Sequence, residues 1–291
     1  MNTPAIYNQA GIYDQLLPPY LFYNSSAQLV SDEDMLATTM AEYFGQPAKQ
    51  LDVLDIGAGT GRMTQRLAPY AARLVCNDKY PAMLDALHTK LPDAEIVTTN
   101  TQSLTAALPP TQQFDMVTAF WTLNYPIGEY LETVEEEIII PRSDFEEGIH
   151  EADAMISGLI KYLKPGGGRL LTYFFDSESP EQQAVTKIWE QLAPDPGGAR
   201  SFTRELAQRS LATAAERSDM EYSAVHYQGI APFTNAGELV RWYKLAHCKS
   251  VTSLVTSRAF TDQTQHLINT YTLPSGVIEL PVGMYELSVK S

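Results

Sequence analysis

The residues best suited to chemistry form a glycine-rich turn, Val53-Leu-Asp-Ile-Gly-Ala-Gly-Thr-Gly, where an apolar run meets a helical pattern. Glycines at 57, 59 and 61 allow the backbone to turn sharply and a ligand to approach it closely. The helix expected after the turn directs free backbone N–H groups at that ligand. Asp55, two residues before the first glycine, adds a carboxylate to the turn.

A dinucleotide-binding turn differs from this one in its last glycine. Its pattern, G-x-G-x-x-G, puts the third glycine three residues after the second, where helix and strand pack closely. Counted from Gly57 and Gly59 that position is Arg62, and counted from Gly59 and Gly61 it is Thr64. The spacing therefore disfavours a nicotinamide cofactor.

Apolar runs and helical patterns alternate on both sides of the turn. Such alternation predicts βαβ units, which build a parallel sheet with helices on both faces. The expected strands are Leu51 to Ile56, Arg73 to Cys76, Glu95 to Thr98, Phe114 to Phe120 and Arg169 to Phe175. The expected helices between them are Met63 to Tyr70, Pro81 to Lys90 and Glu151 to Leu163.

The flanking regions follow other patterns. Residues 1 to 50 are expected to be helical and rich in aromatic residues, with a helix capped by Ser31 that ends near Phe44. After Asp176 the alternation loosens. Helices are expected at Pro180 to Leu192, Thr203 to Arg217, Asn235 to His247 and Arg258 to Tyr271, and strands at Tyr222 to Gly229 and Gly276 to Val289.

Together, the turn and the residues after the strands resemble the class I S-adenosylmethionine-dependent methyltransferases. The resemblance runs from about Leu51 to Phe175 and includes Asp78, Asn100, Phe114-Asp115 and Leu163-Lys-Pro-Gly-Gly in order. It implies an α/β, Rossmann-like methyltransferase sheet, mostly parallel with an antiparallel last strand. It also implies S-adenosyl-L-methionine as cofactor and S-adenosyl-L-homocysteine as product.

The resemblance assigns the cofactor residues one by one. The methionine part is expected over Asp55, Gly57, Ala58, Gly59 and Gly61, and Asp78, followed by Lys79, is expected to hold the ribose hydroxyls. A carboxylate suits a vicinal diol because it accepts two hydrogen bonds at once. Asn100, followed by Thr101, lies where the family more often has Asp at the adenine, which leaves that contact to an amide oxygen. Phe120 and Trp121 are expected at the donor end.

The acceptor residues have weaker signals. In similar enzymes the N-terminal segment is a lid, which suggests Tyr7, Tyr13 and Tyr23 over the cofactor, although aromatic residues at helical spacing can equally be core. The connection from Trp121 to Pro165 adds Asn124 and Tyr125, and Trp242 is a further lining candidate. His150 is the first candidate for a general base and Tyr13 the second, because imidazole titrates near neutral pH.

Charge limits the partners of this chain. The formal net charge of −15 disfavours DNA and RNA, whose binding depends on Lys and Arg. The stretch from Glu129 to Glu151, with Arg142 its one basic residue, is a solvated helical face, a rim that favours a cationic acceptor, or a metal site, although its carboxylates have no defined ligand spacing. No metal-ligand spacing involves Cys76 or Cys248, which are expected to be buried thiols, and no metal is expected.

We therefore predict a cytoplasmic enzyme, a monomer or homodimer without membrane partners, that methylates a small molecule at N, O or C. The chain is expected to be one domain: residues 1–50 as the lid, 51–175 as the cofactor core and 176–291 on the acceptor side. The alternatives are a protein of this fold that catalyses a rearrangement or cyclisation, a non-enzymatic binding module, and a methyltransferase that acts on a macromolecule.

Overall fold

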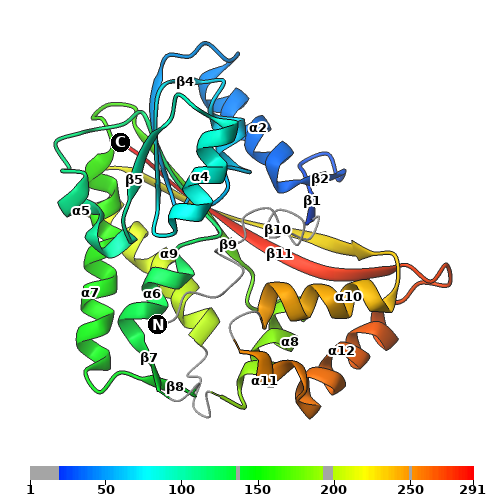
Figure 1. The fold of residues 1–291 in the computed structure, drawn as a ribbon. Coiled ribbons are helices and arrows are strands. Elements are labelled where there is room, and N and C mark those ends of the chain that lie inside the picture. The colour runs from blue at the N-terminus through cyan, green and yellow to red at the C-terminus, as the bar shows by residue number, and fades with distance from the viewer. Residues whose placement is uncertain (1–19, 136–137, 193–198, 249–250) are drawn as a thin grey trace.

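A nine-stranded mixed sheet runs through the molecule in the order β2-β1-β10-β11-β9-β6-β3-β4-β5. The computed structural model describes residues 20–135, 138–192, 199–248 and 251–291 (Figure 1). Strands β5, β4, β3, β6 and β9 are parallel neighbours, and β11, β10, β1 and β2 continue the sheet antiparallel. The strands are β1 (Leu21–Tyr23), β2 (Leu29–Ser31), β3 (Leu51–Ile56), β4 (Ala71–Asp78), β5 (Glu95–Thr98), β6 (Met116–Phe120), β9 (Arg169–Phe175), β10 (Glu221–Phe233) and β11 (Ile278–Lys290).

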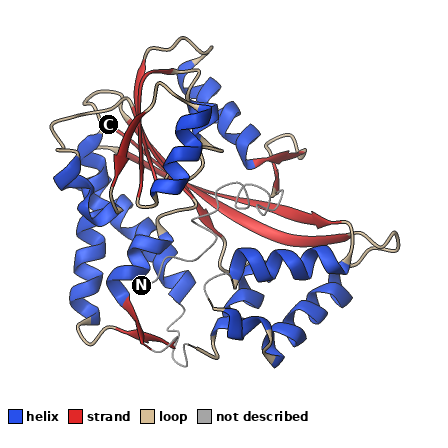
Figure 2. Cartoon of the chain, in the orientation of Figure 1, coloured by secondary structure: helices blue, strands red, loops and turns tan. Residues whose placement is uncertain are grey.

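Helices cover both faces of the sheet, because the central parallel strands are apolar on both sides (Figure 2). The core on one face includes α2 (Asp32–Phe44), α4 (Pro81–Lys90), α8 (Pro180–Trp189), α10 (Ala236–Trp242) and α12 (Arg258–Tyr271). The core on the other face includes α5 (Leu104–Ala107), α6 (Asn124–Leu131), α7 (Phe145–Gly158) and α9 (Ala199–Arg217). The predicted α/β fold with an antiparallel last strand is thus confirmed.

The described part of the N-terminal region, residues 20–50, is less helical than predicted. Only α2 is a helix among residues 20–50, whereas β1 and β2 form a hairpin on the outer edge of β10. Phe22 is fully buried there, opposite Gly229 of β10. An edge strand leaves unpaired N–H and C=O groups, and a short apolar segment that pairs with them satisfies both. A pattern within residues 1–50 could not reveal this distant partner.

Smaller differences lie at the ends of elements. The helix after the glycine turn, α3, covers Thr64–Leu67, and a π-helix at Tyr243–His247 continues α10. The expected helix at Glu151 to Leu163 begins earlier, as α7, and ends in a 3-10 helix at Leu159–Tyr162. The short α11 (Thr252–Val255) precedes α12. None of these differences moves a residue of the glycine turn.

The acidic connection between β6 and β9 contains a hairpin that the sequence analysis missed. Strands β7 (Glu132–Glu135) and β8 (Ile138–Pro141) pair antiparallel between α6 and α7. Part of the acidic charge is neutralised within the chain, since Arg142 lies 2.7 Å from Asp144 and 3.0 Å from Glu151. The connection is therefore not one continuous helical face, and Arg142 offsets only part of its negative charge.

Candidate active site

The glycine turn lies at the carboxyl end of β3 and has the backbone that only glycine adopts readily. Gly57, Gly59 and Gly61 have φ values of 66°, 56° and 84°. A Cβ atom at Gly57 would lie 2.1 Å from Oγ1 of Thr122, whereas at Gly59 it would meet nothing within 4 Å. Gly57 therefore permits close packing against Thr122, whereas Gly59 faces open space that a ligand can enter.

Asp55 supports this turn from beneath. It is buried, and its two carboxylate oxygens accept hydrogen bonds from Thr64 Oγ1 at 2.6 Å and from Thr118 Oγ1 at 2.8 Å. Burial raises the pKa of Asp55 to about 6, although both hydroxyl donors act in the opposite direction. Asp55 therefore joins β3 to β6 and to α3. Because both of its oxygens are used in this way, the carboxylate positions the glycine turn and does not point toward the space beside Gly59.

Asp78 ends β4 beside the turn, as predicted. Its Oδ2 accepts a hydrogen bond from the N–H of Gly59 at 3.0 Å, and its Oδ1 accepts one from the N–H of Tyr80 at 2.9 Å. Burial raises the pKa of the carboxyl group, against the effect of these backbone donors. Asn77, which the sequence analysis did not select, donates from Nδ2 to the carbonyls of Val97 and Thr99 and so fixes β4 to β5.

The residues after β5 face the start of α6. Asn100 is exposed, and its side chain accepts a hydrogen bond from the N–H of Ser103, which caps the 3-10 helix that begins at Thr101. Gln102 donates from Nε2 to Glu129 of α6 at 2.7 Å, and Lys79 forms an ion pair with the same carboxylate. The Oε1 atom of Gln102 is buried without a hydrogen-bond partner among the described residues. Gln102 is therefore a second amide, beside Asn100, that can serve the adenine end.

Trp121 follows β6, and its indole is held by Asp32, which in turn forms an ion pair with Arg62. Its φ of 59° is unusual for a residue with a side chain. The indole Nε1 donates to Oδ2 of Asp32 at 2.8 Å, and Arg62 binds both oxygens of Asp32 at 2.7 and 2.6 Å. Phe120, by contrast, points into the core, where its ring lies 4.8 Å from that of Tyr173. Of this pair, Trp121 is the half-buried residue and is therefore the one that could meet a ligand at this edge.

Other aromatic rings surround Trp121 and form what we call the aromatic cluster. Ring-centroid distances from Trp121 are 4.8 Å to Phe175, 5.6 Å to Tyr20 and 6.1 Å to Phe22, and Tyr20 lies 6.2 Å from Trp242. The members of the aromatic cluster are Tyr20, Phe22, Trp121, Phe175 and Trp242. They bring the segment before β1, the ends of β6 and β9, and α10 together at the carboxyl edge of the sheet.

A buried carboxylate reaches the aromatic cluster from α8. The Oε1 atom of Glu181 accepts a hydrogen bond from the Tyr20 hydroxyl at 3.4 Å and lies 2.6 Å from Nε2 of His247. Its Oε2 accepts a hydrogen bond from Gln182 at 2.7 Å, and Glu181 is 1% exposed. No local sequence motif predicts this arrangement, because its members come from the N-terminal segment, α8 and the π-helix.

The structure separates the predicted acceptor residues. Tyr7 and Tyr13 lie outside the described residues. Tyr23 is 44% exposed, on the strand face opposite to that of the buried Phe22, because neighbouring residues of a strand point to opposite faces. Tyr125 is 46% exposed. Asn124 begins α6 and borders a hollow of about 10 Å³, whose other lining residues are Phe174, Phe175, Ser177, Gln182 and Thr203.

Trp242 and His150 have contrasting surroundings. Trp242 is buried and belongs to the aromatic cluster, with its ring 4.7 Å from that of His247. His150 lies on the exposed side of α7, which packs against α6 and α9. Two other histidines touch buried carboxylates: His247, and His226, whose Nε2 lies 2.8 Å from Oδ2 of Asp176. Of these two histidines, His247 contacts the aromatic cluster through Trp242, so it replaces His150, which was chosen for the acidic stretch before it, as the candidate base.

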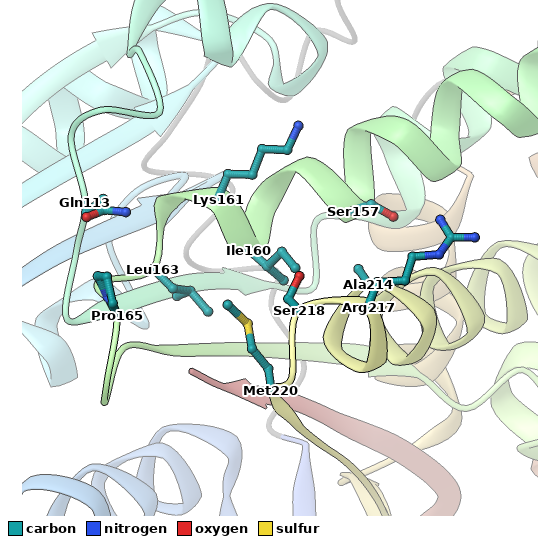
Figure 3. Close-up of a pocket in the computed structure, with 10 residues that line it drawn as sticks. All are labelled: Gln113, Ser157, Ile160, Lys161, Leu163, Pro165, Ala214, Arg217, Ser218 and Met220. Atoms are coloured by element: carbon teal, nitrogen blue, oxygen red, sulfur yellow. The ribbon is translucent and has the colours of Figure 1, made fainter.

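A second cavity lies away from this edge. It measures about 380 Å³ and is bordered by residues before β6, β9 and β10, which places it at the amino ends of the parallel strands. In Figure 3, Ile160, Leu163 and Met220 converge on it, whereas Lys161 and Arg217 extend outward. Ligands of open α/β sheets bind outside the carboxyl ends of the strands, so this cavity is not the cofactor site.

The described part of the chain contains no cluster of metal ligands and no membrane-spanning helix. No group of three or more His, Cys, Asp or Glu side chains gathers there to hold a metal ion. Cys76 and Cys248 are buried, as predicted, and burial raises the pKa of the Cys76 thiol. Among the described helices, none combines the length and apolarity needed to cross a membrane.

Comparison with known proteins agrees with the family resemblance seen in the sequence. Residues 53–140 match a family model described as a methyltransferase domain. This segment contains the glycine turn, Asp78, Asn100 and Trp121. The protein contains a class I S-adenosylmethionine-dependent methyltransferase domain, and it is an S-adenosylmethionine-dependent methyltransferase.

Individual relatives are distant. The chain is 24% identical over 253 residues to the cypemycin N-terminal methyltransferase of a Streptomyces species, covering 86% of this chain and 85% of the relative. A structure of the [4+2]-cyclase SpnF aligns over 99% of this chain and 94% of its own, with a TM-score of 0.52 and 14% identity. A functionally unknown protein from Deinococcus radiodurans R1 aligns over 99% of both chains, with a TM-score of 0.51 and 12% identity. At such identities, the two structures show the fold alone.

The residues at the carboxyl edge fit the cofactor. Gly59 faces open space, Asp78 offers a carboxylate beside it, and Gln102 has an unused amide oxygen. When bound, S-adenosylmethionine supplies a methyl group on a positively charged sulfur. The protein's part is to hold the acceptor in line with that methyl group at near-attack distance and to exclude water. Trp121, whose indole is held by Asp32, would form one wall of such a site.

Proposed function

We propose that this enzyme transfers the methyl group to an amine nitrogen of a small molecule or short peptide. The observation that carries the proposal is Glu181, a buried carboxylate at the aromatic cluster. A carboxylate beside aromatic faces favours a cation, because both attract positive charge. An amine is the usual nucleophile that reaches a site as a cation, whereas phenols and carbon acids arrive neutral or anionic.

Two further features support an amine acceptor. The net charge of −15 raises the local concentration of cations around the protein. The distant relative from Streptomyces is named as an N-terminal methyltransferase, and an N-terminal α-amino group is such an amine. We further propose that the whole chain works as one domain, with residues 1–50 and 176–291 closing the acceptor side of the 51–175 core.

The first test concerns the cofactor. Calorimetric titration with S-adenosylmethionine and S-adenosylhomocysteine should give micromolar binding, which Asp78→Ala should abolish. Asp85→Ala, an exposed change on α4, is the matched control and should bind like the wild type. Binding that survives Asp78→Ala would refute the ribose assignment, and no binding by the wild type would refute the cofactor reading.

The second test concerns the acceptor atom. Glycylglycinamide offers an α-amine, phenol a hydroxyl, and tyramine both an amine and a phenol. Formation of S-adenosylhomocysteine with the first and third compounds, and N-methylation of tyramine by mass spectrometry, would support the proposal. Methylation of the phenol oxygen alone, or cofactor binding without turnover on any of them, would refute it.

A further inference from the structure

A chain of three polar side chains leads away from the aromatic cluster into the core of the protein. The Tyr20 hydroxyl donates to Oε1 of Glu181 at 3.4 Å, and the same oxygen lies 2.6 Å from Nε2 of His247. Tyr20 is partly exposed and contacts Trp121, whereas the side chains of Glu181 and His247 are only 2% and 8% exposed. The series therefore begins at the donor end and ends on a histidine inside the protein.

The protein holds this series in place from several sides. The Tyr243 hydroxyl donates to the carbonyl of Glu181 at 3.0 Å, and Trp189 Nε1 donates to the carbonyl of His247 at 3.1 Å. Gln182 binds the second carboxylate oxygen of Glu181, so that the first is left to Tyr20 and His247. His247 also ends a π-helix, an element that is frequent at functional sites.

An amine acceptor makes a specific demand on such a site. An α-amine or alkylamine at neutral pH binds mainly as an ammonium ion, whose nitrogen has no lone pair with which to attack. One proton must therefore leave before the new bond can form. A buried carboxylate–histidine pair can take up that proton, because the carboxylate stabilises the imidazolium that results.

We propose that Tyr20, Glu181 and His247 form a proton relay that deprotonates the bound amine. This inference rests on the proposed amine acceptor. The N–H bond of the ammonium breaks and its proton passes to the Tyr20 oxygen, while the proton of Tyr20 moves through Glu181 to Nε2 of His247. The free lone pair then forms the N–C bond as the C–S bond breaks. The products are a methylated ammonium, a neutral thioether and one proton on the pair.

The groups around the relay define its pH response. Among the described residues, the titratable groups that contact the His247 ring include Glu181 from α8 and Tyr243 from the π-helix, and Tyr20 reaches it through Glu181. The ring of Trp242 lies 4.7 Å from that of His247, and the indole of Trp189 donates to its backbone carbonyl. The second histidine–carboxylate pair, His226 and Asp176, is a matched control. Its Nε2–Oδ2 distance is a similar 2.8 Å, but the His226 ring stacks on Tyr285 and not on a ring of the aromatic cluster.

The test compares Tyr20→Phe, Glu181→Gln and His247→Gln with the control His226→Gln. Calorimetry with S-adenosylhomocysteine establishes that each variant keeps a folded cofactor site. The dependence of kcat/KM on pH is then measured with glycylglycinamide. We expect each relay variant to lose about 100-fold at pH 7, the lower range for general base catalysis. The loss should shrink toward the wild-type rate above pH 9, where the amine binds without its extra proton.

Recovery at high pH distinguishes the relay from a structural role, since a distorted site loses activity at every pH. An equal loss at all pH values in the relay variants, or a pH-dependent loss in His226→Gln instead, would overturn the inference while leaving N-methylation intact. A wild-type enzyme that methylates neither glycylglycinamide nor the tyramine amine would overturn both.

A second measurement does not depend on turnover. NMR titration of the His247 ring in the protein alone should show its midpoint at lower pH in Glu181→Gln, because the imidazolium loses its carboxylate partner. An unchanged midpoint would show that the two side chains are not coupled, which would also overturn the relay.

Discussion

The close approach of Gly57 to Thr122 in the candidate active site gives a measurable prediction. An alanine Cβ at residue 57 would lie 2.1 Å from Oγ1, 2.6 Å from Cβ and 2.8 Å from Cγ2 of Thr122. The backbone there has a φ of 66°, which costs an L-residue about 1–2 kcal/mol. Overpacking adds about 1–3 kcal/mol. Gly57→Ala should therefore lower the free energy of unfolding by about 2–5 kcal/mol in total.

Gly59 supplies the control for this prediction. Its φ of 56° is similar, but an added Cβ would meet nothing within 4 Å. Gly59→Ala should therefore cost only the backbone component, about 1–2 kcal/mol. Urea unfolding of both variants isolates the packing component as the difference between them.

A double variant tests the contact directly. Thr122→Gly in the Gly57→Ala background removes all three close atoms and should restore the packing component, so that the double-mutant cycle shows a favourable coupling of about 1–3 kcal/mol. If Gly57→Ala costs no more than Gly59→Ala, or if the coupling is zero, then the close approach between the turn and Thr122 is not a feature of the folded protein.

Three further predictions follow from buried charges and from linkage. Arg62→Gln should lower the free energy of unfolding in urea by about 2–4 kcal/mol, because it leaves Asp32 buried without its main partner. Arg66 is more exposed, so Arg66→Gln should lower it by less than about 1 kcal/mol. Equal losses in the two variants would contradict this prediction. Burial raises the pKa of Glu286 to about 7, so the folded state holds a proton that the unfolded state releases near its ordinary pKa of 4.5, and stability falls as the pH rises between these values. Glu286→Gln should therefore add up to about 3 kcal/mol at pH 8 and nothing at pH 4, unlike Glu279→Gln on the exposed side of β11; a gain that does not depend on pH would exclude this cause. Finally, S-adenosylhomocysteine at 100 times its Kd should stabilise the wild type by about 2.7 kcal/mol in thermal unfolding, and a similar gain in Asp78→Ala would show that the ligand binds elsewhere.

The sequence by itself determined the cofactor half of the protein. Its signals are local: a buried strand, a turn that requires glycine, and a carboxylate at the end of the next strand. In a parallel sheet, the carboxyl ends of neighbouring strands meet at one edge, so Asp78 and the glycine turn had to come together. The regular alternation of strands and helices fixed that geometry before any long-range contact was known.

Only the tertiary structure decided the acceptor half. Tyr20 and Glu181 are 161 residues apart, and Asp32 and Trp121 are 89 apart, with no motif linking either pair. Each buried polar group requires a hydrogen-bond partner. In the folded core that partner can come from a distant part of the chain, so the neighbouring sequence does not reveal it. For the same reason His150, chosen from its sequence neighbours, lies on an exposed helix face, whereas His247 lies against a buried carboxylate.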